Sequence, residues 1–195
     1  PTKNPVGDLA IRLRSAVNSD FQYSVGDSAD APVLTITYTG SENTQRSTGL
    51  RFQTVSVPQG ATITSAKLSF VPASSDDRPV VFSVEAEAND NAAPFATNED
   101  FTGRLKTTAT SWNAPEWRTE NPPVLNDGAD VTAHVQKVVS RPGWCGNKAI
   151  AFFLTPESGD GSRTAISQDG HNDLKPTLSI NYTGGDTGCI EPIVE

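Results

Sequence analysis

A hydrolytic triad needs a histidine as its base, and this 195-residue chain has two histidines, while its 23 acidic residues always permit some carboxylate pair. The two histidines are His134, which lies beside Val135 in an apolar-periodic segment, and His171, which lies in the acidic stretch QDGHND. The first pattern indicates a scaffold residue, and the second a solvated loop residue that could also be a ligand or a proton carrier. No GxSxG elbow, HExxH pair or P-loop occurs. We therefore expect no enzyme activity, with a hydrolase that uses an unrecognised carboxylate pair as one alternative.

Oxygen-donating side chains gather in several loops and could bind calcium, which prefers carboxylate and carbonyl oxygens. None of these loops has the spacing of an EF-hand, and Asp and Asn are also common in turns because they cap backbone groups. A structural calcium ion and plain turn formation are therefore both open. The candidate ligands are Asn89, Asp90, Asn91, Asp160, Asp169, Asn172 and Asp173.

Aromatic and polar residues around Pro115 could bind a sugar. Trp112 and Trp117 could stack on a sugar ring, and Asn113 and Arg118 beside them could bind its hydroxyl groups. Tryptophan rings more often pack against a hydrophobic core, so the same two rings could instead cover one end of the fold. We take this segment as the candidate glycan-binding site.

The two cysteines, Cys145 and Cys189, form no CxxC motif, which argues against a zinc site. We expect them to form a disulfide, which would stabilise the fold by about 3–4 kcal/mol in the chain-entropy model. Two buried free thiols are the alternative. Because a disulfide needs an oxidising compartment, we expect a secreted protein that works outside the cell or at its surface.

The elements that would position these side chains are mostly strands, and the segment Leu50–Phe70 shows the pattern best. Leu50 and Phe52 alternate with polar neighbours, which is the two-residue period of a half-buried strand. Pro58, Gln59 and Gly60 then break the run as a turn, after which the alternation resumes. We expect the central hairpin of a sheet.

Alternating or β-branched runs predict further strands, at Asp8–Val17 (or a short helix there), Val33–Thr39, Pro79–Ala88, Leu105–Ser111, Ala149–Thr155, Arg163–Gln168 and Thr177–Tyr182. One helix is expected at Ala129–Ser140, with Asp130 as N-cap and a stripe of valines. The pattern predicts a single all-β domain over residues 1–195, a jelly-roll or Greek-key β-sandwich with one short helix. Residues 184–195 would form a tail that packs on its own domain or adds a strand to a neighbouring copy.

The net charge of −8 supplies no basic stripe to neutralise phosphates, so we expect no nucleic-acid partner. No apolar run approaches the roughly 20 residues of a membrane span, so we expect no membrane insertion. The partners that remain are other copies of the chain, or a glycan or protein at a cell surface. Asn181, followed by Tyr182 and Thr183, forms a glycosylation sequon, a tripeptide that is also common by chance.

Three stretches together resemble a known module: GLRFQTVSVPQGATITSAKLSF (Gly49–Phe70), Val84–Trp117 with its TSWNAPEW end, and DVTAHVQKVVSRPGWCGNKAIAFFL (Asp130–Leu154). Their order and spacing resemble a jelly-roll module of secreted bacterial proteins that occurs beside pilus-tip adhesin-like regions and surface phosphoesterase domains. The segment is also similar to the DNRLRE type of carbohydrate-binding module, over roughly Leu34–Tyr182. The resemblance implies a non-catalytic β-sandwich, with glycan binding in some members.

The two cysteines do not belong to that pattern and indicate adaptation to a particular partner or assembly. We therefore expect a secreted, non-catalytic bacterial module that acts in cell-surface adhesion or extracellular assembly, including self-association into a fibre. A plain glycan-binding module is the alternative within the same class, and a hydrolase is the alternative from another class.

Overall fold

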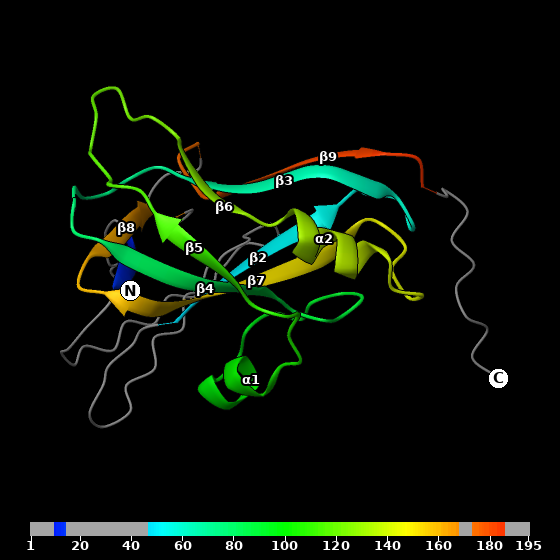
Figure 1. Ribbon diagram of the computed structural model, residues 1–195. Coiled ribbons are helices and arrows are strands. Elements are labelled where there is room, and N and C mark those ends of the chain that lie inside the picture. The colour runs from blue at the N-terminus through cyan, green and yellow to red at the C-terminus, as the bar shows by residue number, and fades with distance from the viewer. Residues whose placement is uncertain (1–9, 15–46, 168–172, 186–195) are drawn as a thin grey trace, which may run out of the picture.

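A computed structural model describes residues 10–14, 47–167 and 173–185 of the chain. These ranges hold nine strands and two short helices (Figure 1). In chain order they are β1 (Ala10–Arg14), β2 (Thr48–Val55), β3 (Thr62–Phe70), β4 (Val80–Ala86), α1 (Asn98–Gly103), β5 (Thr110–Ala114), β6 (Asn126–Asp130), α2 (Thr132–Val139), β7 (Lys148–Gly159), β8 (Ser162–Ile166) and β9 (Thr177–Thr183). The expected strand Val33–Thr39 lies outside the described residues.

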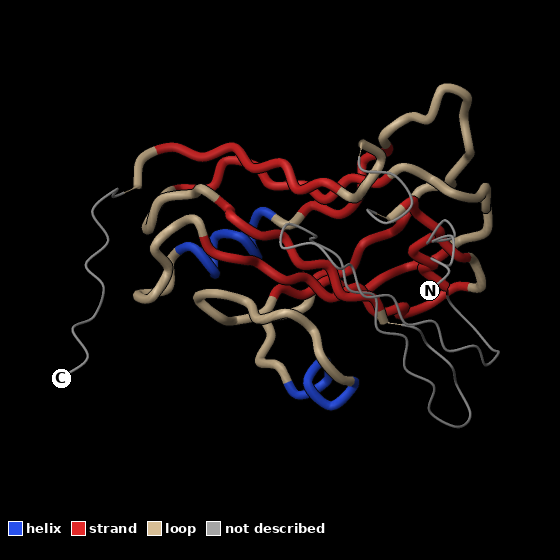
Figure 2. The backbone as a smooth tube through the Cα atoms, turned by 180° about the vertical axis from the view of Figure 1, so that it is seen from behind, coloured by secondary structure: helices blue, strands red, loops and turns tan. Residues whose placement is uncertain are grey.

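Two antiparallel sheets form the layers of a β-sandwich, as Figure 2 shows from behind. One sheet has the order β2-β7-β4-β5 and the other β6-β3-β9, while β1 and β8 form a separate pair. Strands that are neighbours in sequence repeatedly lie in different sheets, as in a jelly-roll sandwich. The predicted all-β sandwich is therefore confirmed.

The expected hairpin at Leu50–Phe70 is wrong, because its two strands belong to different sheets. β2 pairs with β7, and β3 pairs with β6 and β9. The turn at Gly60, whose φ is +67°, carries the chain from one sheet to the other. Apolar alternation shows which face of a strand is buried, but it does not show which strand lies beside it.

The main core lies between the two sheets and contains the alternating residues that the sequence indicates. On β4, Val80, Phe82, Val84 and Ala86 are all buried. Leu68 and Phe70 of β3 pack in the same core from the facing sheet. The four-stranded sheet itself adds Leu50 and Phe52 of β2 and Phe152 and Leu154 of β7.

A second, smaller core covers the outer face of the four-stranded sheet, where the segment around α1 packs on β7 (Figure 1). Phe95 and Phe101 contact Phe153, with ring centroids 5.6 and 5.0 Å away. A buried ion pair between Arg104 and Glu87, 2.8 Å long, lies beneath this segment. Because both faces of β7 are covered, its run from residue 149 to residue 154 is apolar without alternation.

The helices differ from the expectation in number and in bounds. α1 was not expected, and the predicted helix at Ala129–Ser140 is shorter, because its first residues belong to β6. Val131 is the N-cap of α2 in place of Asp130, whose carboxylate accepts a hydrogen bond from the Thr132 amide at 2.8 Å. No helix among the described residues is long and apolar enough to span a membrane.

Candidate ligand-binding site

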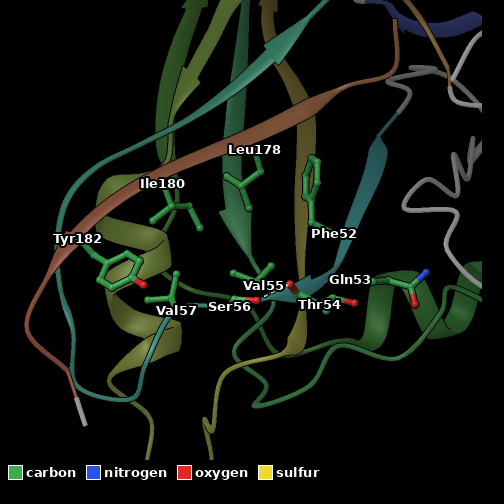
Figure 3. A pocket seen from close by; sticks show the side chains of 9 residues that line it. All are labelled: Phe52, Gln53, Thr54, Val55, Ser56, Val57, Leu178, Ile180 and Tyr182. Carbon is green, nitrogen blue, oxygen red and sulfur yellow. Dashed lines mark hydrogen bonds between the residues drawn. The ribbon is translucent and has the colours of Figure 1, made fainter. Parts of the chain in front are cut away.

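A pocket of about 340 Å³ opens between β2 and β9, which are edge strands of the two facing sheets (Figure 3). It lies at the side of the sandwich, where the two sheet edges approach each other. Nine residues line it: Phe52, Gln53, Thr54, Val55, Ser56, Val57, Leu178, Ile180 and Tyr182.

Apolar side chains from both strands form the inner surface of this pocket. Phe52 and Val57 are buried on the β2 side. On β9, Leu178 and Ile180 are half-buried against the main core, and two residues further on Tyr182 is 41% exposed. Because alternate strand residues share a face, these three β9 side chains line the same pocket.

A break in strand pairing shapes the polar rim of the pocket. The register of β2 against β7 shifts between Phe52 and Val55. Within that break Thr54 has a φ of +54° and is exposed, while Ser56 donates a hydrogen bond to Asn147 Oδ1 at 2.7 Å. A positive φ is unusual for a β-branched residue, because its side chain crowds the backbone there. The rim therefore presents hydroxyl and amide groups from a strained segment.

None of the nine lining residues is Asp, Glu, His, Lys or Arg. The described pocket therefore offers apolar surface, an aromatic ring and neutral hydrogen-bonding groups. Such a surface suits the binding of an uncharged molecule that has both apolar and hydroxyl-bearing faces.

The expected sugar platform is wrong, because its tryptophan rings belong to the main core. Trp117 is fully buried against Phe70, and Trp112 is half-buried and stacks on Phe70 and Phe82, with centroids 6.1 and 5.6 Å away. Their neighbours Asn113 and Arg118 are exposed, and Arg118 forms an ion pair with Glu116 at 3.1 Å. The structure does not bring these four residues together around a free ring face.

The oxygens expected to bind calcium at Asn89–Asn91 are used by protein groups. The Asp90 carboxylate pairs with Arg141, Asn91 Oδ1 accepts from the Ala149 amide at 2.9 Å, and Asn89 Oδ1 accepts from the Asn91 amide at 3.0 Å. This arrangement supports turn formation at that loop.

Only two of the remaining calcium candidates lie in the described part of the chain. Asp160 and Asp173 are exposed, and Asp169 and Asn172 lie outside the described residues. Within the part of the chain that the structure describes, no three acidic, histidine or cysteine side chains form a group that could hold a metal.

Cys145 follows Trp144, whose side chain forms a hydrogen bond with a residue that lines the pocket. Trp144 is fully buried, and its indole N–H donates to the carbonyl oxygen of Val57, a lining residue, at 2.8 Å. Cys145 carries no free thiol, while its expected partner Cys189 lies outside the described residues, so the pairing stays a prediction.

The scaffold role expected for His134 is confirmed. The side chain is buried on α2, with Nδ1 2.7 Å from Thr107 Oγ1 and Nε2 2.8 Å from Thr110 Oγ1. Thr107 Oγ1 in turn accepts from the Ala86 amide at 2.9 Å. A neutral imidazole that donates at one nitrogen and accepts at the other satisfies both contacts, so His134 ties α2 to β4 and to the start of β5. His171 lies outside the described residues.

Burial lowers the pKa of His134 below its ordinary value of 6.5, and Lys137 lowers it further, while Asp130 opposes the shift. The unfolded chain therefore takes up a proton near pH 6.5, where the folded chain does not. We expect the free energy of unfolding to fall as the pH drops below 6.5, by up to about 1.4 kcal/mol per pH unit from this residue. Well above pH 6.5, where neither state binds the proton, it contributes no pH dependence.

Urea unfolding at pH 7.5, 6.5 and 5.5 measures this effect, with His134→Gln as the comparison. Glutamine can also donate and accept a hydrogen bond but does not titrate, so the variant should lose the slope that His134 causes. Parallel pH profiles for the two proteins would show that His134 is not the source.

Comparison with family models and with curated proteins finds no match to this chain. Comparison with solved structures finds a meso-active, thermostable cellulase derived from the Cel12A cellulase of Rhodothermus marinus, with a TM-score of 0.27 and 10% identity, covering 89% of this chain and 100% of that chain. The expected non-catalytic adhesion or assembly module and the expected lack of enzyme activity find no support in this match, and we withdraw both. At this TM-score and identity it assigns no role to any residue here.

Proposed function

We propose that this protein binds a glycan in the pocket between β2 and β9. The observation that carries the proposal is the composition of the pocket, which joins an exposed tyrosine ring and an apolar floor to a rim of hydroxyl and amide groups. A sugar ring has apolar C–H faces and hydroxyl groups at its edge. Aromatic rings with one polar end suit such amphipathic surfaces, and a few placed polar groups give orientation.

The resemblance to DNRLRE-type carbohydrate-binding modules supports the same ligand class. We also propose that the protein acts outside the cell, since Cys145 carries no free thiol and disulfides persist in oxidising compartments. Glycoside hydrolysis uses two carboxylates that flank the bond, and no carboxylate lines the described pocket. Cleavage of a bound glycan would therefore need carboxylates from outside this lining.

We expect Tyr182→Ala to weaken glycan binding about tenfold, which corresponds to about 1.4 kcal/mol, because the exposed ring supplies the stacking surface. A glycan array identifies ligands for the wild-type protein, and calorimetry then compares the affinities. Tyr182→Phe keeps the ring and should bind within a few-fold of wild type.

Leu105→Ala serves as the matched control, because Leu105 is also a large exposed residue, 78% exposed, but does not line the pocket. Equal affinity of Tyr182→Ala and wild type for a ligand would place the binding site elsewhere. An array without any ligand would reject the proposal. Measuring reducing ends after incubation with each ligand tests for hydrolysis in the same samples.

A further inference from the structure

We propose that the ligand of the β2–β9 pocket is an uncharged saccharide, and that Thr54 is a specificity-determining residue for it. The inference rests on the proposed glycan binding and adds to it the charge class of the sugar and the residue that selects it. Two observations carry it: the lining has no charged side chain, and its one β-branched residue with positive φ stands on the rim.

The charge of the protein argues against acidic sugars. Carboxylated or sulfated saccharides are held by arginine or lysine through charge-assisted hydrogen bonds, and the lining contains neither. The net charge of −8 also repels anions at a distance. A cationic amino sugar would call for a carboxylate, which is equally missing from the described lining. Neutral hydroxyl-bearing sugars remain.

Hydrogen bonds of the next two residues, Val55 and Ser56, hold Thr54 in its unfavourable backbone conformation. The Val55 carbonyl accepts from the Asn147 amide at 2.9 Å. Ser56 Oγ contacts both the Thr54 carbonyl, at 3.3 Å, and Asn147 Oδ1, at 2.7 Å. Glycine or asparagine would adopt a φ of +54° at lower cost. Strain of this kind persists where the surrounding structure enforces it, and it is common at ligand contacts.

The Thr54 side chain is available to a ligand. It is exposed on the rim (Figure 3), and its hydroxyl makes no hydrogen bond to another residue of the described ranges. Glycine would relieve the strain but would remove both the hydroxyl and the methyl group. A hydroxyl placed to pair with a sugar hydroxyl discriminates strongly against analogues that lack the partner group. We therefore assign to Thr54 the choice between hydroxylated and deoxygenated sugars.

Thr54→Gly and Thr54→Ser test the assignment. We expect Thr54→Gly to raise the melting temperature by about 2–4 °C, as strain relief does in a chain of this size, while the affinity falls about tenfold. Thr54→Ser keeps the hydroxyl and should bind as wild type does. Wild type and Thr54→Ser should bind deoxy analogues more weakly than the full ligand. Thr54→Gly should bind the deoxy analogues and the full ligand with nearly the same affinity.

The charge class is tested with neutral, uronic-acid and sulfated versions of one glycan, each at 0.05 M and 0.5 M NaCl. We expect the neutral sugar to bind best, with one affinity at both salt concentrations, since screening affects only charged contacts. Tighter binding of an acidic sugar, or wild-type affinity in Thr54→Gly, would overturn the inference. Either result would leave the proposed function intact if Tyr182→Ala still weakened binding about tenfold, whereas an array without ligands overturns the proposed function itself.

Discussion

We expect the substitution Arg163→Met to lower the free energy of unfolding by about 3–5 kcal/mol. Arg163 lies on β8 and is 1% exposed. Its guanidinium donates hydrogen bonds to the carbonyl oxygens of Pro115 at 2.6 Å, Ser162 at 2.9 Å, Ala114 at 3.0 Å and Arg78 at 3.1 Å. One side chain thus holds together β8, the end of β5 and the loop before β4.

The large effect follows from what the substitution leaves behind. Methionine fills a similar volume but donates no hydrogen bond. Four carbonyl oxygens would therefore lose a donor, that of Ala114 in a buried place and the other three in part-buried places, and each such loss is costly. No carboxylate forms an ion pair with Arg163 among the described residues, and burial lowers the pKa of its guanidinium. The contacts to carbonyls, rather than a salt bridge, therefore stabilise this end of the sandwich.

Urea unfolding at pH 7 measures the change, and Arg118→Met is the matched control. Arg118 is exposed and, among the residues that the structure describes, forms an ion pair only with Glu116, two residues away. Its loss should therefore alter stability by less than about 0.5 kcal/mol. Arg163→Lys keeps the charge but has fewer donors, so its stability should lie between those of wild type and Arg163→Met. A loss below 1 kcal/mol in Arg163→Met would show that water replaces the guanidinium.

The sequence predicts which strand faces are buried, because burial repeats every second residue along a strand. Val80, Phe82 and Val84 are examples, and all three are buried. Strand partners follow from long-range packing instead, so the link at Gly60 between two sheets looks the same in sequence as a hairpin turn. The same limit applies to β7, whose continuous apolar run fits a buried strand without showing that a segment around α1 covers its second face.

The candidate site could not be predicted because its two sides come from segments far apart in the chain. Tyr182 ends a stretch that indicates only a closing strand, and nothing in the letters around Thr54 signals a left-handed residue, which is common for Gly and Asn but not for Thr. At Trp112 and Trp117, residue type indicated a binding site where the structure has part of the core. Tryptophan suits both a sugar platform and a core, and only the burial of the rings distinguishes the two.

That distinction leads to the second large expected effect: Trp117→Ala should lower the free energy of unfolding by about 3–5 kcal/mol. The ring is fully buried and packs on Phe70 with centroids 5.6 Å apart. Its removal would leave a cavity that the two sheets cannot close. Its backbone N–H donates to the Asp76 carbonyl oxygen at 3.0 Å, and its own carbonyl oxygen accepts from the Asp76 N–H at 2.9 Å. This pairing keeps the chain in place, so the side chain alone determines the loss.

Trp117→Phe separates packing from any role in sugar binding. The indole N–H has no hydrogen-bond partner in the described part of the chain, so phenylalanine removes a buried unpaired donor and leaves a smaller cavity. We expect a smaller loss of stability than for Trp117→Ala, with unchanged affinity for any glycan that Tyr182 helps to bind. Asn113→Ala, an exposed change on β5, should alter neither property. Thermal melts and calorimetry on the same samples decide, because a stable Trp117→Phe protein that no longer binds glycan would restore Trp117 as a ligand contact.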